Sequence, residues 1–70
     1  MERKQVSSSR IRSVGYDAAT RRLEVEFNNG DIFEYSPVPE DIYRRMMSAT
    51  SVASFFEDRV EEEYSARRVR

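Results

Sequence analysis

The chain has 70 residues, of which 39% are hydrophobic, and its 12 basic and 13 acidic side chains leave a net charge of −1. It contains no cysteine and no histidine, which excludes disulfides, thiol nucleophiles and nearly all zinc sites. A domain this small buries only about 60% of its unfolded surface and must be held by packing alone. The balanced charge argues against a dedicated nucleic-acid binder, which usually carries a positive excess.

The composition predicts one domain over residues 1–70, with an ordered core from about residue 8 to residue 64 and flexible tails on both sides. No apolar run approaches the roughly 18 to 20 residues that span a bilayer. The first five residues lead into serines and not into the apolar segment of a signal peptide. We therefore expect a monomer in the cytoplasm, with no membrane association and no cofactor.

The most informative stretch is a hairpin between residues 21 and 36. Apolar and charged residues alternate on both sides of Asn28-Asn29-Gly30, which is a strong turn signal. A two-residue loop would pair Val25 with Glu34 and place charge on the apolar face. A three-residue loop pairs Val25 with Phe33 instead, so the burial pattern selects this register and a positive φ at Gly30.

A strand over residues 10–17 precedes the hairpin. If residues 18–21 form a four-residue loop, Tyr16 faces Leu23 and Val14 faces Val25, so that the apolar positions of three strands share one side. Gly15 lies inside this strand and suggests a bulge or a close backbone approach.

Two helices follow the sheet. Pro37 and Pro39 end the third strand, and Pro39 suits the first turn of a helix that ends near residues 49–50. Ser51 is a plausible N-cap for a second helix with an apolar stripe at four-residue spacing. The fold class is therefore α+β, with a three-stranded antiparallel meander covered on one face by two helices (β-β-β-α-α). The expected core is Val14, Tyr16, Leu23, Val25, Phe27, Phe33, Tyr35, Ile42, Met46, Phe56 and Val60.

A series of short motifs in the chain resembles the KTSC family, which is named after the C-terminal domain of some lysyl-tRNA synthetases. In order they are V-S-S-S-R-I, V-G-Y-D (14–17), L-E-V-E-F-N-N-G (23–30), F-E-Y (33–35), V-P (38–39), Y-R-R-M (43–46) and A-T-S-V-A-S-F-F (49–56). The resemblance covers about residues 6–64. The shared order and spacing of the motifs argue against a chance match.

The resemblance implies a small free-standing bacterial or phage protein from a family without an established activity. An RNA-binding role for the family is suggested by its association with the synthetase. The central Y-x-Y motif of the family falls on Phe33 and Tyr35, so this chain lacks the first hydroxyl. The family glycine in the second helix corresponds to Ala53.

Four arginines are the candidate nucleic-acid contacts: Arg10, Arg12, Arg21 and Arg22. They come from the first strand and the first hairpin, where they could form a basic strip on the open sheet face or its rim and contact phosphates. Glu24, Glu26 and Glu34 are expected on the same face, and mixed charge there is also typical of an ordinary solvated sheet surface.

The aromatic pair Phe33 and Tyr35 has two interpretations. Exposed rings stack on unpaired bases, whereas the predicted register places both rings under the helices. We favour a core role for both.

Other functions have weaker support in the sequence. No nucleophile is paired with a base, and the carboxylates of the second helix diverge, so we expect no catalytic residue and no metal site. Ile11 and Ile32 are expected on the open face, where they are candidates for a protein contact, and an exposed edge strand could add to another chain. The sequence thus predicts a recognition module for RNA or, alternatively, for a protein partner.

Overall fold

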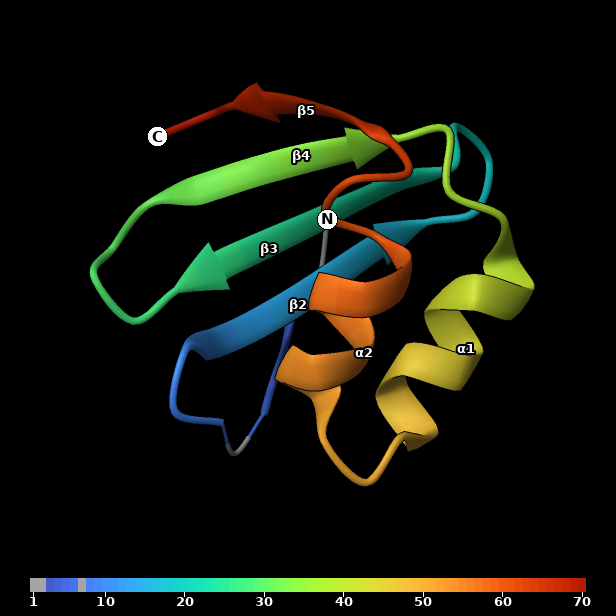
Figure 1. Ribbon diagram of the computed structural model, residues 1–70. Coiled ribbons are helices and arrows are strands. Elements are labelled where there is room, and N and C mark those ends of the chain that lie inside the picture. The colour runs from blue at the N-terminus through green and yellow to red at the C-terminus, as the bar shows by residue number, and fades with distance from the viewer. Residues whose placement is uncertain (1–2, 7) are drawn as a thin grey trace.

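The computed structural model describes residues 3–6 and 8–70 as a five-stranded antiparallel sheet with two helices packed on one face (Figure 1). The strands follow one another across the sheet in chain order, from β1 at one edge to β5 at the other. The elements are β1 (Arg3–Gln5), β2 (Ile11–Asp17), β3 (Arg22–Phe27), β4 (Ile32–Ser36), α1 (Glu40–Ser48), α2 (Val52–Arg59) and β5 (Ser65–Arg68).

The registers predicted for the three central strands are confirmed. Val14 pairs with Val25 and Tyr16 with Leu23, and Val25 pairs with Phe33 across the hairpin. The Phe27 amide donates to the Asp31 carbonyl at 2.9 Å, which closes the three-residue loop with Gly30 at a φ of 95°. Apolar side chains of β2, β3 and β4 consequently line one face.

The prediction of only three strands is wrong. Arg3–Gln5 pairs with residues 13–15 of β2, and Ser65–Arg68 pairs with residues 33–36 of β4. Both segments lie in the predicted tails, since no apolar alternation marks them, and the structure leaves every residue of these two strands exposed. Residues 1, 2 and 7 of the expected N-terminal tail lie outside the described residues.

The expected exposure of Ile11 and Ile32 is also wrong. The β2–β3 register shifts between Ile11 and Ser13, and this irregularity turns Ile11 onto the core side opposite Phe27, where it is fully buried. The bulge thus lies beside Arg12 and not at Gly15, which stays paired with Glu24. Ile32 keeps its place opposite Glu26, but its backbone pairs with residues 69 and 70, and it is only 3% exposed.

The helices begin where the capping residues predict. Pro39 precedes the first turn of α1, and the helix ends at Ser48 with Ala49 as its C-cap. The Ser51 hydroxyl accepts from the Ser54 amide at 3.2 Å and caps α2. Helix α2 ends at Arg59, earlier than the apolar stripe suggests, and the turn that follows still buries Val60.

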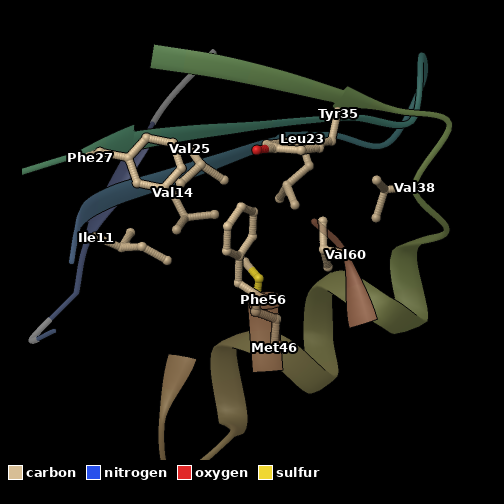
Figure 2. Packing of buried hydrophobic residues seen from close by; sticks show 10 residues of the cluster. All are labelled: Ile11, Val14, Leu23, Val25, Phe27, Tyr35, Val38, Met46, Phe56 and Val60. Atoms are coloured by element: carbon tan, nitrogen blue, oxygen red, sulfur yellow. The ribbon is translucent and has the colours of Figure 1, made fainter. Parts of the chain in front are cut away.

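The core lies between the sheet and the helices. Figure 2 shows Phe56 rising from α2 toward the strands, and its ring packs edge-on against Phe27 at 5.7 Å and Tyr35 at 5.2 Å. Burial raises the pKa of the Tyr35 phenol. Val38, which the sequence analysis did not include, is fully buried, whereas Tyr16, Phe33 and Ile42 are only partly buried at the margin.

Candidate functional site

Charge is divided between the two layers of the molecule. The segments that build the sheet, residues 3–36 and 65–70, contain nine basic and five acidic residues, a net charge of +4. The helical segment between them, residues 37–64, contains three basic and seven acidic residues, a net charge of −4. The small total charge therefore conceals a basic sheet layer and an acidic helix layer.

The sheet face that points away from the helices, here called the open face, has a row of recessed carboxylates. Side chains of Glu24, Glu26 and Glu34 are only 15%, 21% and 12% exposed. The arginines that pair with them are more exposed, between 31% and 73%. Guanidinium N–H groups therefore form the outer layer of this face, above carboxylates that are already paired.

Two of the four predicted arginines belong to the open face. Arg12 lies 3.7 Å from Glu26, and its guanidinium also donates to the Asn28 carbonyl at 3.0 Å. Arg22 lies 3.9 Å from Glu34. Five residue steps of β2 separate these two positions, because Arg22 pairs with Asp17, so they lie roughly 17 Å apart along the strand.

Arg21 lies in the exposed loop between β2 and β3, at the end of the sheet near Arg22. Its backbone is left-handed, with a φ of 56°, and its carbonyl accepts from the Val38 amide at 2.9 Å. This backbone hydrogen bond joins the loop to the segment that leads into α1.

Arg10 does not join a strip with the other three arginines. Its guanidinium binds Glu57 at 2.7 Å and Glu61 at 2.6 Å, next to α2, and lies over the ring of Phe27 at 5.1 Å. The hydrogen bonds to Glu61 and Glu57 raise the pKa of Arg10. This arginine ties the start of β2 to the helix layer, so the structure does not bring it together with Arg12 and Arg22 on the open face.

Two further arginines, which the sequence analysis missed, complete the open face. Arg3 binds Glu24 at 2.9 Å and Arg67 lies 3.6 Å from Glu34. Both come from the edge strands β1 and β5. No sequence signal marked these segments as strands, so nothing indicated that their arginines would meet the glutamates of the central strands.

The two members of the aromatic pair, Phe33 and Tyr35, differ in burial. Tyr35 is 3% exposed and belongs to the core cluster. Phe33 is partly exposed, contacts Phe27 edge-on at 5.9 Å and lines a pocket of about 350 Å³ at the turn end of the hairpin. The core interpretation therefore describes Tyr35 and only part of the Phe33 ring.

Two negative observations apply to residues 3–6 and 8–70. In this part of the chain, no three histidine, cysteine, aspartate or glutamate side chains come together as a metal ion would require. Nor does any helix found there have the length and apolar character needed to cross a bilayer.

The fold and the open face together define a class of protein: a small α+β domain in which two helices cover one face of a five-stranded antiparallel meander. The model of the KTSC domain family matches residues 7–64. The chain therefore belongs to the KTSC domain family, as the motif resemblance implied.

Relatives of known sequence and structure agree with this assignment. The crystal structure of a KTSC domain protein from Yersinia pestis superimposes with a TM-score of 0.93 at 38% identity, covering 99% of this chain and 97% of that chain. An uncharacterized protein of Stutzerimonas stutzeri is 38% identical over 56 residues, which cover 80% of this chain and 79% of the relative. A protein of Tsukamurella paurometabola is 31% identical over 61 residues, covering 87% and 91%.

Proposed function

We propose that this domain is a non-enzymatic recognition module that binds RNA weakly through phosphate contacts on the open face. The observation that carries the proposal is the exposed layer of arginines above recessed glutamates, from Arg3, Arg12, Arg22 and Arg67. Arginine forks match the geometry of phosphate oxygens, and an approaching phosphate meets N–H donors before it meets a carboxylate.

The division of charge supports the same orientation. A polyanion is attracted by the basic sheet layer and repelled by the acidic helix layer, so it would approach with the open face toward it. The glutamates also limit the affinity, because each open-face arginine already has a carboxylate partner. A phosphate must compete with that partner, which is why we propose weak binding.

The alternative, a protein-interaction module that uses the open face or an edge strand, has less support. Its two apolar anchors, Ile11 and Ile32, are buried. The edge strands are short and carry Arg3, Lys4, Arg67 and Arg68, and such basic edges resist pairing with a second copy of the same chain. RNA binding is therefore the better-supported proposal.

The test is the salt dependence of RNA binding in a variant with Arg12→Gln and Arg22→Gln. Glutamine is preferable to glutamate at these positions, because a new carboxylate would lie beside Glu26 or Glu34 and disturb the sheet. Each lost phosphate contact lowers the slope of log affinity against log salt by about 0.7 for a single strand. We expect the slope to fall by about 1.4 and the low-salt affinity to drop by on the order of tenfold.

The matched control is Arg44→Gln with Arg45→Gln, on the exposed side of α1. This variant has the same total charge as the first but keeps the open face intact. Equal losses in both variants would show that only net charge matters, and an unchanged affinity in the open-face variant would refute the proposed surface.

A further inference from the structure

The pocket at the turn end of the hairpin combines aromatic and polar side chains in a volume of about 350 Å³. This volume lies within the range of small-ligand sites. Phe27 and Phe33 supply aromatic surface on its walls, and Phe33 keeps part of its ring exposed. The other main lining residues are Arg10, Asn28, Asn29 and Asp31.

The charges around the pocket are already matched. Arg10 is held by Glu57 and Glu61, and the Asp31 carboxylate accepts from Arg68 at 2.9 Å. A charged occupant would therefore leave its own charge without a partner in the pocket. The chemistry suits a neutral, planar group that stacks on a ring and uses hydrogen bonds at its edge.

Arg12 connects this pocket to the open face. Its guanidinium lies 3.7 Å from Glu26 on the open face and donates at 3.0 Å to the carbonyl of Asn28, a lining residue of the pocket. From the neighbouring edge strand β5, the Arg68 guanidinium donates to the carboxylate of Asp31, another lining residue of the pocket. The Phe27 and Phe33 rings share the helix-covered side of the sheet with Val25. A strand with phosphates near Arg12 would therefore pass around the hairpin turn to place its next base in the pocket.

We propose that this pocket receives one unpaired base of an RNA strand whose phosphates lie on the open face, so that the domain selects single-stranded RNA over duplex. This inference rests on the proposed function and adds the substrate class. A base that is stacked and paired in a duplex cannot reach an aromatic wall behind the hairpin turn, whereas an unpaired base is free to turn out of the strand.

The test uses Phe33→Trp as a reporter, because the chain contains no tryptophan. A base that stacks on the new indole quenches its fluorescence. The probes are a ten-nucleotide single strand, the same strand with its central bases removed, and the corresponding duplex. Tyr43→Trp is the control, since Tyr43 stacks on Tyr16 at the opposite end of the sheet from the hairpin turn.

We expect the single strand alone to quench the fluorescence of the Phe33→Trp variant, and no probe to change that of the Tyr43→Trp variant. We also expect Phe33→Leu, which keeps an apolar side chain but lacks the ring face, to lose about tenfold in affinity for the single strand.

The outcomes separate the two proposals. Salt-dependent binding of the single strand without quenching, or equal binding of the strand that lacks bases, would overturn the pocket and leave the open face in place. The absence of any salt-dependent RNA binding by the wild-type protein would overturn both.

Discussion

The arginines of this protein differ in how firmly they are held, which depends on the carboxylates and aromatic rings that each one contacts. Arg10 lies between Glu57 and Glu61 and over two aromatic rings, so it stabilises the joint between β2 and α2. Arg12 and Arg22 have single carboxylate partners at longer distances and half-exposed side chains. The same residue type is thus held firmly between two layers in one place and is loosely paired and half-exposed in another.

Arg21 is strained because a side chain with a Cβ occupies left-handed backbone at a φ of 56°. Left-handed backbone costs such a residue about 1–2 kcal/mol, whereas glycine has no such cost but gives up about 0.5–1 kcal/mol in chain entropy. We expect Arg21→Gly to match or slightly exceed the wild-type stability, and Arg21→Val to be less stable than Arg21→Gly by about 1–2 kcal/mol. Urea denaturation of the three proteins measures this difference.

Equal stability of the glycine and valine variants would contradict the strain. The glycine variant has a second use, because it removes one of the four predicted phosphate contacts without distorting the loop. Its RNA affinity reports whether Arg21, near the end of the sheet where β3 begins, adds to the open face.

Among the strands and helices, those with strong turn, capping or alternation patterns could be predicted from the sequence, and those without such patterns could not. The hairpin was predictable in register because a turn triplet and period-2 alternation agree, and a slip of one residue would expose every apolar side chain. Both edge strands escaped prediction because their side chains are all exposed and their pairing depends on tertiary contacts. Arg3 and Arg67 of the candidate site were missed for the same reason.

The bulge beside Arg12 shows a second limit. Gly15 was the residue that suggested an irregular strand, yet the register shift falls where no glycine marks it. At the bulge, the buried Ser13 hydroxyl donates to Glu26 at 2.7 Å, and the Ile11 side chain is buried in the core. The bulge thus accompanies the burial of Ile11 in the core beneath the helices, a tertiary contact that the local sequence does not mark.

Strand β5 should contribute measurably to stability. A chain that ends at Tyr64 loses the β4–β5 ladder, including the backbone bonds between Ile32 and residues 69 and 70. At about 0.5–1.5 kcal/mol for each hydrogen bond, we expect a loss of roughly 2–4 kcal/mol in urea denaturation. A truncated chain as stable as the full one would contradict the role of β5.

The control for this truncation is Arg67→Gln with Arg68→Gln in the full chain. It removes the exposed ion pairs with Glu34 and Asp31 but keeps the backbone ladder. Because exposed ion pairs contribute little, we expect a loss of about 1 kcal/mol or less.

For the whole molecule, the division of charge is what makes the proposed polyanion surface compatible with a nearly neutral chain. The net charge of −1 argued against nucleic-acid binding when the chain was considered as a whole. Folding places the surplus of basic residues in one layer and the surplus of acidic residues in the other. The relevant quantity is therefore the charge of each face, which depends on topology and becomes visible only once the strands are ordered.

The measurement that tests this account most directly is an amide NMR titration of the labelled protein with a mixed single-stranded RNA, at low and then at high salt. We expect shifts on the open-face strands and at the hairpin turn, with little change in α1 or α2. The strand shifts should lie around Arg3, Arg12, Arg22 and Arg67. High salt should remove the shifts on the strands. An absence of shifts at millimolar RNA, or shifts concentrated on the helices, would contradict it.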